Sequence, residues 1–175
     1  HNQLGIDALK NREDGTVMRA GFEQSAASWN NRIVERHPAG GGYLWQTFDF
    51  DNADPKKIIK KRPLGPGRDN GFEHDMNAVL FSLPNGMNAF FLSRDDGNRL
   101  DTAPAEILHD ETHPRRPVFA GVSCFSCHAG GVRDVVDEIR GHVATSAAFS
   151  DSDRNEVERL YAIQDELDRQ IADDR

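Results

Sequence analysis

A chain of 175 residues can form one domain with a hydrophobic core but is too short for two comfortable ones. Its 29 acidic and 21 Lys and Arg side chains give a formal charge of −8, so the average surface would repel a nucleic acid or an anionic membrane. The sequence has no run of about 18 uncharged apolar residues, and residues 1–15 lack the apolar centre of a signal peptide. We therefore expect a single domain (1–175) without a membrane span. Because the sequence starts at His1 without an initiator Met or an export signal, we expect a mature form, a processed fragment or a cloned domain.

The N-terminal part of the chain predicts two helices and a strand. Residues 5–14 and 22–35 have the apolar spacing of short helices. The glycine-rich stretch 37–42 predicts a flexible turn. In residues 43–51, apolar and polar side chains alternate imperfectly, and the aromatic content favours a strand.

The middle of the chain contains the clearest signal for β structure. Two apolar runs within residues 78–93 flank the tripeptide Pro-Asn-Gly at 84–86. Asn-Gly tolerates the positive φ angles of a tight turn, so this segment predicts a β-hairpin. An irregular loop at 61–71 precedes the hairpin, and residues 99–108 fit either a further short strand or the start of a helix.

The C-terminal part predicts helices. Valine and isoleucine residues between 132 and 144 recur at spacings of three and four, which places them on one stripe of a helix. A second helix over 153–173 could be capped by Asp153 with Glu156 as its capping-box partner. Together these segments predict an α+β domain in which helices pack around a small antiparallel sheet.

The pentapeptide Cys-Phe-Ser-Cys-His at 124–128 contains both cysteines of the chain. C-x-x-C-H is the attachment motif of c-type haem. Two thiols add to the two vinyl groups on one edge of the porphyrin, and the histidine that follows is offered to the iron. Cys124 and Cys127 would form the thioethers, and His128 would be the proximal ligand. Because the motif uses every thiol of the chain, we expect one covalent haem c with the helices and sheet packed around it.

Other interpretations of the motif remain open. A thioredoxin-type redox pair would need a strand that feeds a helix in a βαβ unit, which the antiparallel pattern does not favour. A structural zinc site would need two more ligands, for which His109, His113 or His142 are available. A plain reduced or disulfide-closed pair is the remaining alternative.

The second axial position of the iron separates an electron carrier from an enzyme, because two strong protein ligands leave no vacancy for peroxide or oxygen. His74 and Met76 precede the hairpin two residues apart and would point to the same face of an extended chain. We rank His74 first, Met76 second and His37 third as the second ligand. A five-coordinate iron is the alternative.

Three arginines flank the motif: Arg115, Arg116 and Arg133. A guanidinium fork suits the carboxylates of haem propionates. The same residues could equally be ordinary surface charges.

The chain resembles a family of uncharacterised bacterial monohaem c-type cytochrome domains that usually form part of longer exported proteins. The similar stretches cover most of the sequence and lie at 19–37, 43–50, 63–93, 99–110 and 121–134. In that family, histidines correspond to His74 and His37, and glycine often occupies the position of Met76. The resemblance thus implies His74 as the second ligand with His37 in reserve.

The position of the motif also predicts the fold. Ordinary small cytochromes c have the motif near the N-terminus of an all-helical domain, whereas here about 120 residues with a predicted sheet precede it. We therefore expect a fold other than the standard cytochrome c fold.

These observations lead us to expect a periplasmic or secreted bis-histidine cytochrome domain that carries single electrons, because covalent haem attachment takes place outside the bacterial cytoplasmic membrane. An acidic surface would favour redox partners with a basic docking surface. One alternative is a five-coordinate haem enzyme or sensor, either peroxidase-like or binding small ligands. The other is an interaction module with a structural haem.

Overall fold

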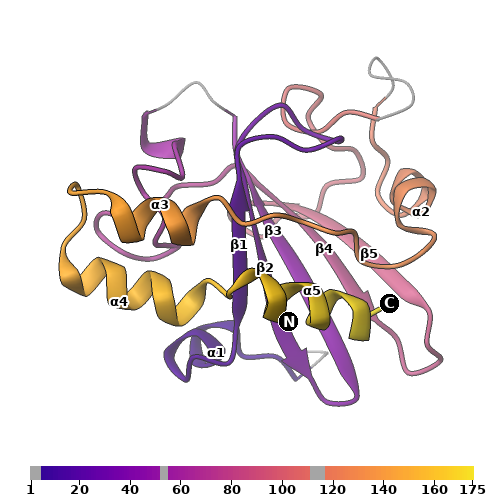
Figure 1. Ribbon diagram of the computed structural model, residues 1–175. Coiled ribbons are helices and arrows are strands. Elements are labelled where there is room, and N and C mark those ends of the chain that lie inside the picture. Colours follow the sequence, from indigo (N-terminus) through magenta and orange to yellow (C-terminus); the bar gives the residue numbers. More distant parts are fainter. Residues whose placement is uncertain (1–4, 52–54, 111–116) are drawn as a thin grey trace.

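The computed structural model describes residues 5–51, 55–110 and 117–175, which form an antiparallel sheet with helices on both of its faces (Figure 1). The five strands of the sheet follow one another in chain order. They are β1 (Met18–Phe22), β2 (Arg32–Ala39), β3 (Gly42–Asp49), β4 (Met76–Ser82) and β5 (Asn88–Arg94). The expected α+β class with an antiparallel sheet and a β-hairpin is confirmed.

The helices gather in different places around the sheet. They are α1 (Ala8–Glu13), the 3₁₀-helix η2 (Pro55–Lys57), α2 (Val122–His128), α3 (Ile139–Thr145), α4 (Asp151–Leu160) and α5 (Gln164–Asp173). In Figure 1, α3 and α4 lie together beyond β1, whereas α2 lies on the opposite side of the molecule near β5. In the described part of the chain, no helix has the length and apolar character needed to cross a bilayer.

The register of the strands divides the sheet into two faces. Ile33 pairs with Phe48, whereas the next residue, Val34, pairs with Thr47. Successive side chains of a strand point to opposite faces. Face A thus carries Ile33, Glu35, His37, Gln46 and Phe48, and face B carries Arg32, Val34, Trp45, Thr47 and Leu80.

Each face has its own hydrophobic core. On face A, Ile33 and Phe48 are buried in one cluster with Ile139 of α3 and Leu160 of α4. The cluster on face B joins Val34, Trp45 and Leu80 to side chains of α5, namely Leu167 and Ile171. Burying a Leu or Ile side chain contributes about 1.5–3 kcal/mol, so a few such contacts are enough to hold each helix on the sheet.

Residues 22–35 are not a helix as predicted, because they contain the loop between β1 and β2 and the start of β2. Ile33 and Val34 fit a helical spacing within a short window, but both are β-branched and alternate between the faces of the sheet. Trp29, expected on the apolar side of a helix, lies in the loop and is 63% exposed.

The C-terminal helices also differ from the prediction. Residues 132–138 are not helical, and α3 begins at Ile139 because the Asp137 carboxylate accepts hydrogen bonds from the backbone N–H groups of Gly21 and Arg140. The expected long helix is divided at Tyr161, whose extended backbone forms a bridge to Arg19. The N-cap of α4 is Ser150, with Asp153 as its capping-box partner instead of the cap itself.

Candidate functional site

The cysteine motif forms the short helix α2 at the surface of the molecule. Gly121 precedes the helix with a φ of 79°, which favours glycine. Backbone hydrogen bonds tie the preceding segment to residues 101–103, because Ala120 donates to Asp101 and Ala103 donates to Val118. Residues three apart lie on the same side of a helix, so α2 presents Cys124 and Cys127 in one direction.

His128 is held in the tautomer that suits a metal ligand. Its Nδ1 lies 3.0 Å from the carbonyl oxygen of Gly131, and since a carbonyl only accepts, Nδ1 carries the proton. Nε2 therefore keeps its lone pair. Burial lowers the pKa of His128 against the opposing effect of the bond to Gly131, and a neutral imidazole is the form that binds metals.

Neither cysteine forms a disulfide, which bears on the competing interpretations of the motif. Burial raises the pKa of the Cys124 thiol, whereas a thioredoxin-type nucleophile needs a lowered one. The described residues contain no group of three or more His, Cys, Asp and Glu side chains arranged to hold a metal ion. His142, a suggested zinc ligand, lies 3.0 Å through Nε2 from the carbonyl of Lys60, and His113 lies outside the described residues.

A cavity of about 430 Å³ opens beside α2. Face B of the sheet contributes one wall, and α2, residues 132–136 and residues 108–110 contribute the others. Its lining is mostly apolar, and its volume falls within the roughly 300–1,000 Å³ that is usual for cofactor sites. Cys124, Cys127 and His128 all line this cavity, so the residues present fit a large apolar cofactor attached through α2.

Cations lie at the same cavity. Arg133, which the sequence suggested as a propionate partner, lines it, and Arg32 of β2 lines it as well. Arg32 forms an ion pair with Asp49 across the β2–β3 ladder. The other two predicted propionate partners, Arg115 and Arg116, lie outside the described residues.

Neither histidine that we ranked as a second iron ligand lines the cavity. His37 is fully buried on face A, where its Nε2 lies 2.8 Å from Oε1 of Glu35. The ring of His74 packs against the ring of Phe48, also on face A, with 5.0 Å between centroids. The sheet therefore separates both side chains from the cavity on face B.

Met76 lies on the cavity's side of the sheet but is not part of the lining. It pairs with Asp49 and is fully buried in a cluster with Leu92 and Leu108. The expectation that His74 and Met76 share a face is wrong, because β4 begins only at Met76 and the chain before it turns towards Phe48.

The cavity contains one histidine that the sequence did not rank. His109 lines it, and its ring stacks on Trp29 with 3.9 Å between centroids. The backbone N–H of His109 donates to the carbonyl of Ala27. The position of His109 depends on contact between its own loop and the loop that contains Ala27 and Trp29. The spacing of residues in the sequence does not predict this contact.

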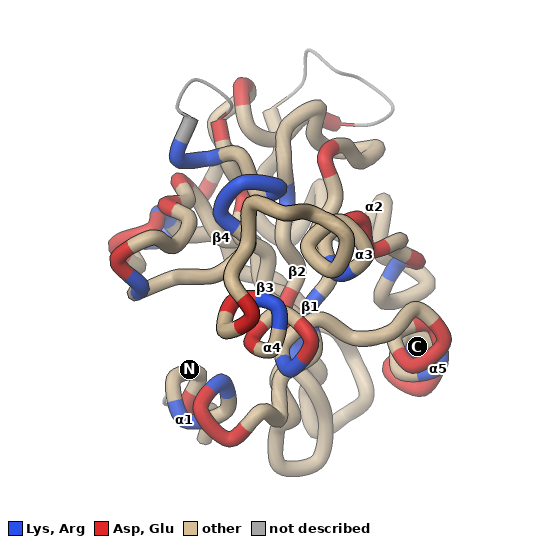
Figure 2. The backbone as a smooth tube through the Cα atoms, turned by 60° about the vertical axis from the view of Figure 1, so that its left-hand side comes forward, with Lys and Arg blue, Asp and Glu red and all other residues tan. Residues whose placement is uncertain are grey.

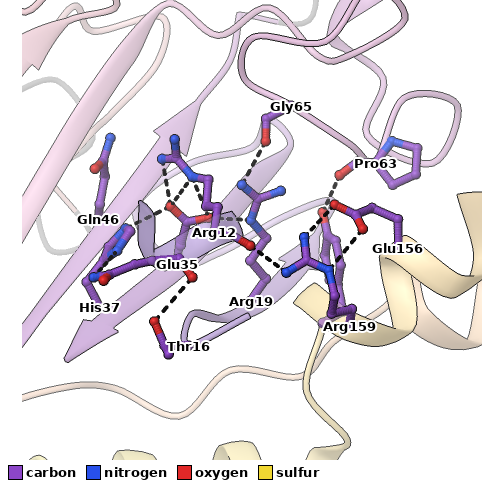
Figure 3. A network of polar contacts seen from close by, with 12 residues as sticks. Arg12, Thr16, Arg19, Glu35, His37, Gln46, Pro63, Gly65, Glu156 and Arg159 are labelled. Carbon is purple, nitrogen blue, oxygen red and sulfur yellow. Dashed lines mark hydrogen bonds and ion pairs between the residues drawn. The ribbon is translucent and has the colours of Figure 1, made fainter. Parts of the chain in front are cut away.

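A buried ionic cluster occupies face A (Figure 3). Glu35 accepts hydrogen bonds from Arg12 and Arg19, and His37 lies against the same carboxylate. Burial alone would raise the pKa of Glu35, but Arg19, His37 and Arg12 together hold it well below its usual value. The cluster joins α1, β1 and β2 and has no access to the cavity, so we interpret it as structural.

Comparisons of the chain with protein-family models, with curated proteins and with solved structures found no match. A functional interpretation therefore rests on the geometry of the cavity and on the motif in α2.

Proposed function

We propose that this chain is a c-type cytochrome domain that holds one covalently attached haem and carries single electrons. The observation that carries the proposal is the position of both thiols and a neutral imidazole, from one helical turn, on the wall of one mostly apolar cavity. A bound haem supplies one-electron chemistry. The protein would anchor the haem through Cys124 and Cys127, and Nε2 of His128 would bind the iron.

Two further features support a haem in this cavity. Val34, Trp45 and Leu80 on face B offer an apolar wall against which a flat ring can pack. Arg133 and Arg32 both line the same cavity, and carboxylates favour guanidinium groups, although Arg32 already forms an ion pair with Asp49. We propose Arg133 as a partner of the propionates, and we extend the proposal to Arg115 and Arg116 because they precede the same helix in the sequence.

The location and partners of the domain follow from the same proposal. Covalent attachment outside the cytoplasmic membrane means that the domain works in the periplasm or beyond it, as part of a larger exported protein. Asp and Glu are prominent on α4 and α5, whereas α2 carries no charged side chain of Lys, Arg, Asp or Glu (Figure 2). We propose redox partners with a basic surface that approach this acidic domain.

The experiment that tests the proposal is production of the chain with a c-type haem maturation system and a periplasmic leader. We expect the intact mass to increase by one haem, and the haem to stay with the polypeptide after denaturation. The double variant Cys124→Ala, Cys127→Ala should lose covalent haem completely.

Ser126→Ala is the matched control, because Ser126 lies between the two cysteines in α2 but offers no thiol to a vinyl group; its hydroxyl donates to the carbonyl of Ser123 and lies 4.0 Å from Sγ of Cys127. It should retain haem. A wild-type chain that matures without covalent haem, while a known cytochrome matures in the same cells, would refute the proposal.

A further inference from the structure

We infer that His109 is the second iron ligand of this domain, together with His128. The inference rests on the proposed function and specifies the coordination of its haem. Among the described histidines and methionines, His109 and His128 are the two whose side chains line the cavity. The second axial position thus has one candidate in this part of the chain, and it differs from the three that the sequence favoured.

The hydrogen bonding of the histidines sets His109 apart. His37 has Glu35 as partner, His128 has the carbonyl of Gly131, and His142 has the carbonyl of Lys60. His109 is only 6% exposed, and its ring packs on Trp29. Among the described residues, the buried side-chain atoms left without a hydrogen-bond partner are Nη1 of Arg19 and Oε1 of Gln46, so the ring nitrogens of His109 are not buried orphans. They are open at the cavity that His109 lines, where a ligand can reach them.

Ring stacking and backbone hydrogen bonds hold His109 in place and leave its ring nitrogens available. The stack on Trp29, with 24° between the ring planes, occupies a face of the imidazole. The nitrogens lie in the ring plane and stay available. The backbone bond to Ala27 and the burial of Leu108 in the cluster with Met76 hold the segment in place. Such support of a ligand by its neighbours is typical of metal sites.

A second imidazole ligand has a consequence for function. Two strong protein ligands keep the iron low-spin and leave no position for peroxide or oxygen. The inference therefore favours the electron carrier over the five-coordinate enzyme or sensor.

The test uses the haem-loaded chain and electron paramagnetic resonance with optical spectra of the oxidised and reduced forms. The wild type should be low-spin. His109→Ala should become high-spin and bind carbon monoxide and cyanide rapidly, and added imidazole should restore the low-spin spectrum. His74→Ala, which removes the ligand expected from the sequence, is the control and should remain low-spin.

A second variant keeps the inference falsifiable if His109→Ala does not fold. His109→Met offers a thioether in place of the imidazole, and because a Met and His pair raises the reduction potential of haem, its potential should lie above that of the wild type. The inference is overturned by a high-spin wild type, by a low-spin His109→Ala, or by an unchanged potential in His109→Met. Each of these outcomes requires covalent haem to be present, whereas a chain without haem would refute the proposed function itself.

Discussion

The buried carboxylate of Glu35 is expected to contribute more to stability than any exposed ion pair of this domain. The side chains of Glu35 and Arg19 are both fully buried, and Arg12 adds a second, largely buried guanidinium. Replacing Glu35 with Gln removes the charge and leaves Arg19 without compensation inside the protein. Breaking a buried pair in this way costs about 3–5 kcal/mol, a large share of the roughly 5–15 kcal/mol that stabilises a typical domain.

The assay is chemical unfolding of the wild type and Glu35→Gln in the same purified form, followed by circular dichroism. Glu73→Gln is the control, because Glu73 forms an ion pair with Lys56 in which both side chains are about half exposed or more. Such pairs contribute about 0–1 kcal/mol, so the control should unfold close to the wild type. If Glu35→Gln lowers the free energy of unfolding by less than about 1 kcal/mol, the ionic cluster on face A does not stabilise the fold as its burial implies.

Two further predictions concern pH and packing. Because the pKa of Glu35 is lower in the folded state than in the unfolded chain, its stabilisation is present above about pH 4.3 and decreases as the pH falls below that value. The stability difference between wild type and Glu35→Gln should therefore narrow in acid unfolding titrations, and a difference that stays constant down to pH 3 would contradict this linkage. In Gly21→Ala, the added Cβ would lie 2.6 Å from the side chain of Ile139, so we expect a loss of about 1–3 kcal/mol from overpacking in thermal unfolding. In Gly141→Ala, the added Cβ would have no atom within 4 Å, so this variant should stabilise α3 by up to about 1 kcal/mol. Equal changes in stability for Gly21→Ala and Gly141→Ala would show that α3 does not pack on β1 as described.

The parts of the fold that could be predicted from the sequence are those with local causes. The hairpin of β4 and β5 follows from the flanking apolar runs and lies at the expected place, although residues 83–87 connect the strands and Gly86, not Asn85, has a positive φ. β3 follows from alternation within one segment. The motif at 124–128 stands out in the sequence because its residues are consecutive, and the haem that it predicts stays a prediction.

The predictions that failed depended on distant contacts. The sequence predicts a helix at residues 22–35 because a short apolar window contains no signal of the pairing between β1 and β2. The break at Tyr161 depends on its bridge to Arg19 and on the hydrogen bond of its hydroxyl to the carbonyl of Pro63. Such tertiary contacts override local helical spacing.

The candidate site was predictable only in part for the same reason. Cys124, Cys127, His128 and Arg133 were identified from one stretch of sequence, and all four line the cavity. His74 was favoured by its position before a strand, but its packing against Phe48 is set by the sheet as a whole. The sequence suggests His109 only as a possible zinc ligand, because its place in the cavity depends on two loops and the sheet that are distant in sequence.

The most direct test of the central claim is the intact mass and optical spectrum of the chain after maturation with c-type haem machinery. The account predicts one covalent haem per chain, retained in Ser126→Ala and lost when both Cys124 and Cys127 are replaced by Ala. A wild-type chain that folds without covalent haem would contradict this account. The motif of α2 would then have to be explained as a redox pair, a zinc site or a plain cysteine pair.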